Sequence, residues 1–339
     1  MDNINYKKTV LITGVAGFIG HHLLEGLLKQ TDWNVVGLDA LTYAGNLSRI
    51  NDIGPWNKEQ HRFKFIWHDL RSPLSETIHK MIGQVDYIWH LAAESHIDKS
   101  LEDSIPFVMA NVLGTANLLE YVKHYQHNLK KFVNFSTDEI YGSAPDGVFF
   151  NEEAPLKPSN PYSASKAGAD MMAYTFGHAF NIPVIITRCM NVFGERQHPE
   201  KFIPKTIKAI LENRKVLIHG SPGEVSFRFW IHARNVADFL MFLMERGELK
   251  ETYNIVGVEK DVLSVANLAS QIIKGRPLAD NEIEYMNFHD ARPGHDRRYA
   301  LDGTKAKKLG WEPKLNFEES FEKMVKWMIA DQNKRWLDL

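Results

Sequence analysis

The stretch TVLITGVAGFIG, residues 9–20, decides the fold. Its first half is a run of apolar and β-branched side chains that predicts a strand. Its second half carries Gly14, Gly17 and Gly20, and a helical pattern follows at 18–30. Glycines at such a turn let the backbone approach a pyrophosphate, whose charge then lies at the helix N-terminus. Because a strand-to-helix turn can require glycine for geometry alone, the triplet is weak evidence by itself.

The same alternation of apolar runs and helical patterns continues over the first 190 residues. Further strands are predicted at 34–40, 63–69, 87–93, 131–137 and 183–189. The spacing of apolar residues between them predicts helices at 74–83, 105–127 and 162–180. Apolar strands separated by helices are typical of a parallel sheet covered on both faces, so we expect an α/β fold with a doubly wound parallel (Rossmann) sheet.

The pattern loosens after about residue 190. Helices are predicted at 202–213, 234–246, 264–274 and 317–331, with short strands at 215–219 and 252–256. We expect a Rossmann domain over 1–190 and a smaller C-terminal lobe over 191–339 that packs on it. Parts of 228–256 could return to the sheet, so this boundary is approximate.

Composition excludes several classes of protein. Lys and Arg number 40 and Asp and Glu 42, so the chain lacks the basic surplus of a nucleic-acid-binding protein. Its one cysteine, Cys189, cannot form an intrachain disulfide. No apolar signal-peptide core precedes the first strand, and the apolar cluster at 239–244 is far short of the ~20 residues that span a bilayer. We expect a cytoplasmic protein with neither nucleic acid nor membrane as a partner.

Acidic residues at two strand ends strengthen the dinucleotide interpretation. Asp39 ends the second predicted strand, where a carboxylate can bind ribose hydroxyls and would repel a 2′-phosphate. The order of strand, glycines, helix, strand and acid therefore predicts NAD rather than NADP as cofactor. The alternative is that Asp39 caps the following turn. Asp69, at the end of the third predicted strand, is a candidate contact on the adenine side.

Tyr162 and Lys166, in PYSASK, are a candidate catalytic pair. Four residues apart on a predicted helix, they share one face. A lysine ammonium near a phenol lowers the pKa of the phenol, which would make Tyr162 a general base. Alone, such a pair is more often a packing pair. Combined with Gly-x-x-Gly-x-x-Gly, however, Tyr-x-x-x-Lys resembles the extended short-chain dehydrogenase/reductase family.

That resemblance implies which residues lie beside NAD. In addition to Tyr162 and Lys166, the expected contacts are Gly14, Gly17, Phe18, Ile19, Gly20, Asp39, Asp69, Leu70 and Ala92.

The fifth predicted strand ends in STDEIYG, residues 136–142, with two adjacent carboxylates. On a regular strand Asp138 and Glu139 would point to opposite faces, so both can reach one substrate only if the strand breaks into a turn here. A solvated acidic turn is the alternative on composition alone. The string resembles the STDEVYG of nucleotide-sugar 4,6-dehydratases of the dTDP-glucose type. The resemblance extends over essentially the whole chain through strings at 39–50, 91–104, 158–170, 198–205 and 292–302.

The resemblance implies a dehydration in which Thr137, Asp138, Glu139, Tyr162 and Lys166 are catalytic. Tyr162 takes the proton of the sugar 4-hydroxyl while NAD accepts the hydride from carbon 4, and Thr137 hydrogen-bonds that hydroxyl. Glu139 then removes the acidified proton at carbon 5, and a protonated Asp138 donates to the departing 6-hydroxyl. Return of the hydride to carbon 6 gives a 4-keto-6-deoxy sugar, so we expect NAD to be tightly retained.

The resemblance also implies a set of contacts to a nucleotide-diphosphate sugar. Arginine suits diphosphate because its planar fork donates to two oxygens. As isolated residues, most of the candidates would more often be surface charges or structural hydrogen-bonders. They are Ser95, His96, Asn191, Lys201, Arg228, Asn254, Arg292 and His295.

Departures from the family pattern leave the substrate open. They fall at 193–201, 217–220 and 228–230, near the expected nucleobase and sugar, so either dTDP-glucose or a UDP-sugar fits. Rival functions are an epimerase or a 5,6-dehydratase on the same scaffold, or a non-catalytic NAD-binding sensor.

Two further expectations concern assembly and metal. The helices at 105–127 and 162–180 correspond to the dimer-forming pair of the family, which implies a homodimer, although the same apolar stripes could face the sheet. The 15 histidines form no metal-ligating spacing, so we expect no metal site.

Overall fold

A seven-stranded sheet forms the centre of the computed structural model, which describes residues 7–286 and 298–338. The strand order is β11-β6-β5-β4-β1-β2-β3, and every neighbouring pair is parallel. The predicted strands are found within one to three residues of their expected ends. They are β1 (Thr9–Thr13), β2 (Asn34–Asp39), β3 (Phe63–Trp67), β4 (Tyr87–His90), β5 (Lys131–Thr137), β6 (Val184–Cys189) and β11 (Thr252–Ile255).

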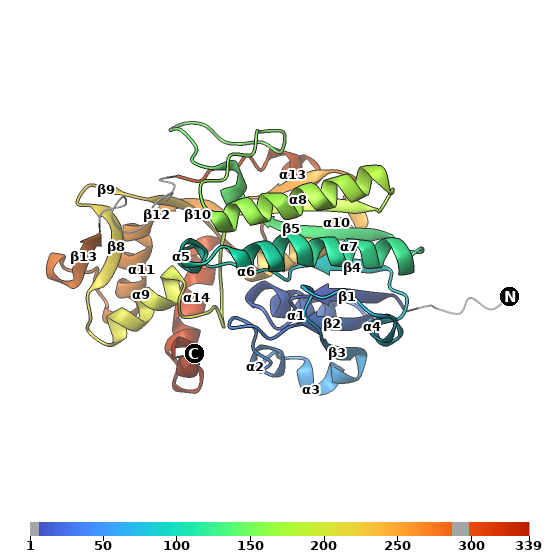
Figure 1. Cartoon of the computed structure of the whole chain (residues 1–339). Helices are drawn as coiled ribbons and strands as arrows, with labels where there is room; N and C mark the ends of the chain where they lie inside the picture. The colour runs from blue at the N-terminus through green and yellow to red at the C-terminus, as the bar shows by residue number, and fades with distance from the viewer. Residues whose placement is uncertain (1–6, 287–297, 339) are drawn as a thin grey trace.

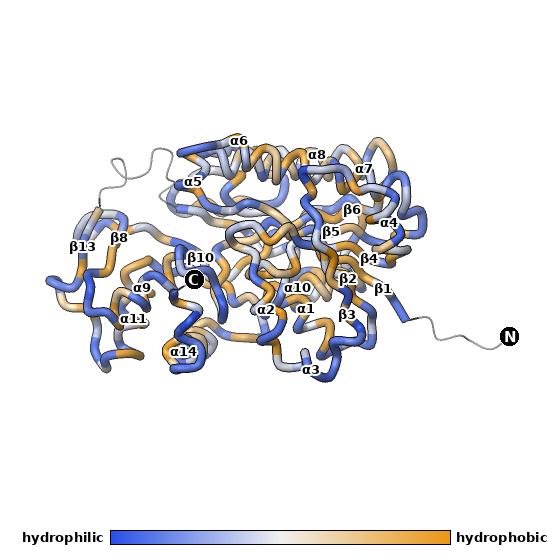
Figure 2. The backbone as a smooth tube through the Cα atoms, turned by 60° about the horizontal axis from the view of Figure 1, so that its bottom comes forward, coloured by the Kyte–Doolittle hydropathy of each residue, from blue (hydrophilic) through white to orange (hydrophobic). Residues whose placement is uncertain are grey.

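Helices cover both faces of this sheet, which confirms the doubly wound α/β fold (Figure 1). One face packs on α1 (Phe18–Gln30) and α10 (Ala233–Arg246), and their side chains share an apolar core with β1 and β4. The opposite core includes side chains of α4 (Glu76–Ile82), α7 (Gly114–Tyr125) and α8 (Pro161–Ala179). Figure 2 shows the apolar colouring running through these inner layers.

The predicted helix at 105–127 is interrupted by a π-helical turn. A short helix α6 (Ile105–Phe107) passes through this turn, Val108–Leu113, directly into α7. The continuous segment Ile105–Tyr125 is long and apolar enough, by length and composition alone, to cross a membrane. Of its apolar window 44% is buried inside the structure, and it packs along α8 as the core helix of a globular protein does.

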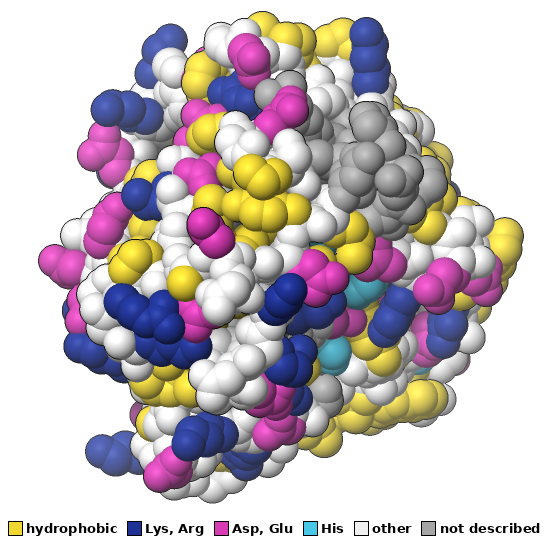
Figure 3. Space-filling view, turned by 90° about the vertical axis from the view of Figure 1, so that its left-hand side faces the viewer, with side chains coloured by type: hydrophobic (Ala, Val, Ile, Leu, Met, Phe, Trp, Pro, Cys, Tyr) yellow, Lys and Arg dark blue, Asp and Glu magenta, His cyan; other side chains and the backbone are white. Residues whose placement is uncertain are grey.

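The C-terminal lobe is built on two small three-stranded sheets. Their orders are β12-β10-β7 and β13-β8-β9. The strands are β7 (Asn191–Phe193), β8 (Val216–Ser221), β9 (Glu224–Val225), β10 (Phe227–His232), β12 (Val258–Asp261) and β13 (Ile283–Met286). Helices α9 (Phe202–Leu211), α11 (Val262–Lys274) and α14 (Phe317–Ile329) supply most of its apolar core. Figure 3 looks onto this end of the molecule, where basic, acidic and histidine side chains are interspersed.

The described chain also contains several 3₁₀ helices and four further short α-helices. The latter are α2 (Ser48–Asn51), α3 (Trp56–Glu59), α5 (Ile97–Glu102) and α13 (Thr304–Lys308).

The strand order reverses between β1 and β4, and ligands of open α/β sheets bind at such a point, beyond the carboxyl ends of the strands. The glycine-rich turn follows β1 there, and the STDEIYG string spans the end of β5 and the turn after it. Strand β11 lies at the edge of the large sheet and α10 packs on α1. The second half of the chain therefore contributes one strand and one covering helix to the seven-stranded sheet. The division at residue 190 stays a prediction.

Candidate active site

The glycine-rich turn packs so closely against backbone atoms that it has no room for a side chain at Gly14 or Gly20. Gly14 has a φ of +73°, which glycine adopts without strain, and a Cβ there would lie 2.7 Å from the backbone nitrogen of Ala92. A Cβ on Gly20 would lie 2.1 Å from the carbonyl oxygen of Gly14. Helix α1 begins after Gly17, and no side chain of the described residues caps it. The N–H groups of its first turn therefore face an anion-binding position.

Asp39 fixes this turn to the second strand. Its Oδ2 accepts a hydrogen bond from the N–H of Ala16 at 2.9 Å, and its Oδ1 accepts one from the N–H of Leu41 at 2.8 Å. The turn-capping alternative is thus present in the structure. Asp39 also borders a cavity of about 100 Å³ beside the glycines, together with Asp69, Leu70 and Ala92. That these four residues contact the adenosine of a cofactor stays a prediction.

A larger cavity of about 300 Å³ brings the predicted catalytic residues together. Gly14, Gly17, Phe18, Ile19 and Gly20 form one side of it. The other side is lined by Thr137, Asp138, Glu139, Tyr162 and Lys166. A dinucleotide lying along the glycine turn would therefore place one end beside the Tyr-Lys pair and the two carboxyl groups.

The Tyr-Lys pair is positioned by the start of α8. Asn160 accepts a hydrogen bond from the N–H of Ser163 at 2.9 Å, while the hydroxyl of Ser163 pairs with the N–H of Asn160, which forms a capping box. Pro161 occupies the first helical position. The ammonium of Lys166 donates to the carbonyl oxygen of Phe135 at 2.7 Å, so the pair is held against β5.

The two carboxyl groups lie on a 3₁₀ turn, Asp138–Tyr141, that directly follows β5. The turn is the break in the strand that lets both side chains reach one cavity. Thr137 accepts a hydrogen bond from the N–H of Glu139 and donates to Asp138 Oδ1 at 3.1 Å. Asp138 is only 3% exposed, and its Oδ2 has no hydrogen-bond partner within the described parts of the chain.

Burial shifts the pKa values of two groups at this site, Asp138 and Lys166, in opposite directions. Burial, and then the negative charge of Glu139, raise the pKa of Asp138 from 3.8 to about 8, so Asp138 carries a proton at neutral pH. Burial lowers the pKa of Lys166 to about 8, and the charge of Asp170 partly opposes that effect.

The pKa of Tyr162 is raised in this structure, and the lowering effect expected of Lys166 stays a prediction. Burial, followed by the negative charge of Glu139, raises the pKa of the Tyr162 phenol. The Lys166 ammonium is directed to a backbone carbonyl instead.

A second cavity of about 490 Å³ extends from Glu139 into the C-terminal lobe. Five of the predicted substrate residues line it, namely Ser95, His96, Asn191, Lys201 and Arg228. Lys201 donates to the carbonyl oxygen of Ser95 at 2.8 Å, which joins the two walls of the cavity. The guanidinium of Arg228 lies 4.9 Å from the ring centre of Tyr299, an aromatic partner that the sequence did not indicate.

The structure does not bring Asn254 to either cavity. This residue lies on β11 with 0% exposure, and its side-chain amide donates to the carbonyl oxygens of Phe150 and Asp302 while accepting from the Tyr141 hydroxyl. Because every polar atom of its side chain is already engaged, the expected diphosphate contact is corrected to a structural role. Arg292 and His295 lie outside the described residues.

Sequence reasoning missed Glu200, which lines both cavities. Glu200 accepts from the hydroxyl of Tyr43 at 3.2 Å, and its carboxylate lies 3.6 Å from His96. Glu200 therefore connects Tyr43, in the loop after β2, with His96 at the start of α5. Its position beside Lys201 in a matched string was the available signal.

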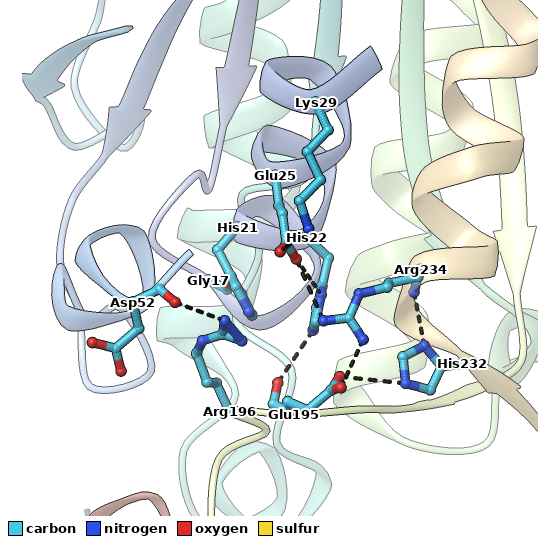
Figure 4. A network of polar contacts seen from close by, with 10 residues as sticks. All are labelled: Gly17, His21, His22, Glu25, Lys29, Asp52, Glu195, Arg196, His232 and Arg234. Atoms are coloured by element: carbon cyan, nitrogen blue, oxygen red, sulfur yellow. Dashed lines mark hydrogen bonds and ion pairs between the residues drawn. The ribbon is translucent and has the colours of Figure 1, made fainter. Parts of the chain in front are cut away.

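The loop after β7 is anchored to α1 through two buried carboxylates and the half-buried Arg234 between them (Figure 4). Arg234 donates to Glu195 at 2.6 Å and lies 3.5 Å from Glu25 on α1. Burial alone would raise the pKa of Glu195, but its hydrogen bond with His232 and the charge of Arg234 hold that pKa well below its usual range. Glu195 lies within 193–201, one of the stretches that depart from the family pattern. Its ion pair with Arg234 therefore holds the loop that leads to Lys201.

No cluster of three or more histidine, cysteine or acidic side chains suited to a metal ion occurs at 7–286 or 298–338.

The fold and this site define an extended short-chain dehydrogenase/reductase, a protein with a dinucleotide cradle, a Tyr-Lys pair and a neighbouring substrate lobe. Comparison with known proteins narrows the class. The chain belongs to the family described as GDP-mannose 4,6 dehydratase, whose family model matches residues 11–324.

Two curated relatives are similar over nearly the whole chain. The low-salt glycan biosynthesis protein Agl12 of Haloferax volcanii is 40% identical over 95% of this chain and 99% of its own length. A trifunctional UDP-glucose 4,6-dehydratase/UDP-4-keto-6-deoxy-D-glucose 3,5-epimerase/UDP-4-keto-L-rhamnose-reductase (RHM3) of Arabidopsis thaliana is 37% identical over 98% of this chain, which spans 48% of that plant protein.

A solved structure agrees with the cofactor prediction. The dTDP-glucose 4,6-dehydratase of Bacillus anthracis, crystallised in complex with NAD, has a TM-score of 0.85 and 36% identity, covering 98% of this chain and 99% of that one. The glycine cradle and the uncapped start of α1 in the present structure fit the same cofactor. NAD is therefore the cofactor of this protein.

Proposed function

We propose that this protein is a hydro-lyase, an NAD-dependent nucleotide-sugar 4,6-dehydratase that converts an NDP-hexose to its 4-keto-6-deoxy form. The observation that carries the proposal is the position of Asp138 and Glu139. Both line one cavity with Tyr162 and Lys166, so oxidation and loss of water can take place on the same bound sugar. An epimerase needs the Tyr-Lys pair but has no use for a protonated carboxyl beside an ionised one.

The residues of the chain divide the reaction between them. Tyr162 accepts the proton of the 4-hydroxyl, and the adjacent Thr137 hydroxyl orients that oxygen. NAD, held along the glycine turn beside Tyr162, would supply the hydride acceptor for carbon 4 and the hydride donor for carbon 6, and its charged nicotinamide ring would favour the Tyr162 phenolate. Glu139 removes the carbon 5 proton, which the new ketone has acidified, and returns a proton to carbon 5 when carbon 6 receives its hydride. Asp138 gives its proton to the 6-hydroxyl, which leaves as water.

Burial supports this division of the acid and base roles. Asp138 is the more deeply buried carboxyl group, and its raised pKa keeps the proton that a general acid needs. Two carboxyl groups at one site cannot both ionise at low cost, so protonation of Asp138 leaves Glu139 as the base.

The substrate is a dTDP- or UDP-linked hexose. Cations along the second cavity suit a diphosphate, and they include Lys201, Lys205, Arg214, Lys215 and Arg228. Names of relatives point to both nucleotides, since the bacterial structure is a dTDP-glucose enzyme and the plant protein a UDP-glucose enzyme.

Incubation with dTDP-, UDP-, GDP- and CDP-glucose, followed by mass spectrometry, tests the function. We expect at least one of the first two to lose the mass of one water and to gain a carbonyl that reacts with hydrazine. An epimerised product of unchanged mass would support the epimerase, and an unsaturated product without a ketone the 5,6-dehydratase. Absence of any turnover by the NAD-loaded protein would favour the non-catalytic sensor.

The pH dependence of the dehydration follows from Asp138. A general acid works only while protonated, so the rate should fall above pH about 8, where Asp138 loses its proton. Deprotonation of Lys166, whose pKa is also about 8, should steepen this decline. Single-turnover rates between pH about 6 and about 10 measure it. A rate that is constant across this range would contradict the assignment of Asp138 as the acid.

We further propose a cytoplasmic homodimer. An apolar strip of exposed side chains runs along the 105–125 helix and α8, and a second copy would cover it in a four-helix contact. Its members are Ile105, Val108, Met109, Leu113, Met171 and Tyr174. Sedimentation velocity should give twice the mass of one 38.9 kDa chain. The reducing compartment is supported by the single buried Cys189.

A further inference from the structure

A chain of buried polar contacts lies behind the catalytic cavity and begins on α8. Asp170, one turn beyond Lys166, has 0% exposure. Its Oδ1 accepts a hydrogen bond from the side-chain amide of Asn134 on β5 at 3.0 Å. Its Oδ2 accepts one from Nε of Arg188 on β6, also at 3.0 Å. The helix that carries the Tyr-Lys pair is thereby fixed to two neighbouring strands.

Arg188 continues the chain toward the carboxyl groups. Its Nη1 donates to the hydroxyl of Tyr141 at 2.6 Å and to the carbonyl oxygen of Glu152 at 3.0 Å. The Tyr141 hydroxyl in turn donates to Asn254 Oδ1 at 3.2 Å. Tyr141 is 1% exposed and is the last residue of the 3₁₀ turn that presents the acid and the base.

The contacts therefore join the two halves of the active site from behind. At one end is α8, which carries the groups for oxidation, and at the other is the Asp138–Tyr141 turn, which carries the groups for elimination. None of Asp170, Arg188 and Tyr141 lines either the 300 Å³ or the 490 Å³ cavity. They can act on the reaction only through the residues that they position.

We propose that Tyr141, held by Arg188 and Asp170, is a positioning residue for the elimination step and keeps Glu139 aimed at carbon 5 while the sugar stays against Tyr162. The inference rests on the proposed function and adds residues that no resemblance assigned. Thr137 precedes the turn and is hydrogen-bonded to both carboxyl residues, which fixes the start of the turn. Tyr141 is the last residue of the turn and fixes its other end.

Removing the Tyr141 hydroxyl should affect the two chemical steps unequally. In Tyr141→Phe the buried Asn254 oxygen loses its donor and Arg188 loses one acceptor, so the end of the turn is released. A shift of a catalytic group by about 1 Å can cost about 100-fold in rate. Tyr162 and Lys166 remain in place on α8, and Lys166 keeps its hydrogen bond to the carbonyl oxygen of Phe135. Oxidation at carbon 4 should therefore proceed.

The test is a single-turnover experiment with the NAD-loaded enzyme and whichever of dTDP- and UDP-glucose the wild type converts. In Tyr141→Phe, absorbance of the reduced nicotinamide should rise at close to the wild-type rate and then persist. Product formation should slow by about 10- to 100-fold. Tyr121→Phe is the matched control, because Tyr121 is also buried at 3% exposure and hydrogen-bonded, to Gln126 on the far side of the sheet from the cofactor turn.

A second variant guards against an effect of misfolding. Arg188→Lys keeps the positive charge beside Asp170 but replaces the fork that reaches both Asp170 and Tyr141, so the reduced cofactor should accumulate again. Equal slowing of oxidation and elimination, or unchanged product formation in Tyr141→Phe, would overturn the proposal. Failure of the wild type to dehydrate any sugar would instead count against the proposed function, so the two failures are distinguishable.

Discussion

Glu139→Gln is expected to stop the loss of water while the sugar is still oxidised. Glutamine has nearly the same shape but cannot accept the carbon 5 proton, and removal of a general base costs about 10²- to 10⁴-fold in rate. Tyr162 and Lys166 are unchanged, so the reduced nicotinamide should form and remain. Stopped-flow absorbance with the converted NDP-glucose, together with mass spectrometry of the product, measures both effects.

Exchange at carbon 5 provides a more direct measurement. Wild-type enzyme in deuterated water should place deuterium at carbon 5 of the product, because Glu139 returns a solvent-derived proton there. The Gln variant should place none in recovered substrate. Glu153→Gln, at an exposed position outside both cavities, is the matched control. If Glu139→Gln turns over the best substrate at the wild-type rate, the assigned base is wrong.

Tyr162→Phe should give the opposite pattern, with no reduced nicotinamide at any time. Phenylalanine fills the same buried volume but cannot take the proton of the 4-hydroxyl, so hydride transfer stops before it begins. We expect a loss of at least about 10²-fold in kcat, the lower end of general-base effects. Bound NAD, measured after gel filtration, should match the wild type because the glycine cradle is untouched.

The two variants together separate the steps of the reaction. Accumulated reduced cofactor in one and its absence in the other would place Tyr162 before Glu139 in the sequence of proton transfers. Formation of reduced nicotinamide by Tyr162→Phe at the wild-type rate would contradict the first assignment. Thermal unfolding of each variant checks that the loss is chemical, since neither substitution leaves a cavity of any size.

Much of the fold could be predicted because its signals are local. The apolar runs that form the parallel strands are short and bounded by turns, and the predicted strand 131–137 is found at Lys131–Thr137. The turn at Asp138 could be predicted as well, since two acids can share a cavity only where a strand ends. The π-helical turn at Val108–Leu113 has no comparable signature, and the sequence pattern reads through it as one helix.

Features that depend on burial and on distant partners could not be predicted. The sign of the pKa shift of Tyr162 depends on how deeply the phenol lies, and spacing to Lys166 carries no information on that. The resemblance implied a substrate contact for Asn254, yet its contacts come from Tyr141, Phe150 and Asp302. The charged anchor of Glu195 to α1 likewise joins residues far apart in sequence.

The edge strand β11 has a consequence for how such enzymes can be recombined. Strand β11 and helix α10 belong by sequence to the substrate lobe, yet they complete the large sheet beside β6 and cover α1. A chimera that exchanged everything after residue 190 would replace part of the cofactor scaffold along with the specificity pocket. If Lys201 and Arg228 bind the sugar nucleotide as proposed, a new sugar preference would be introduced by exchanging the start of α9 and the segment of β10 that carry them, within an intact framework.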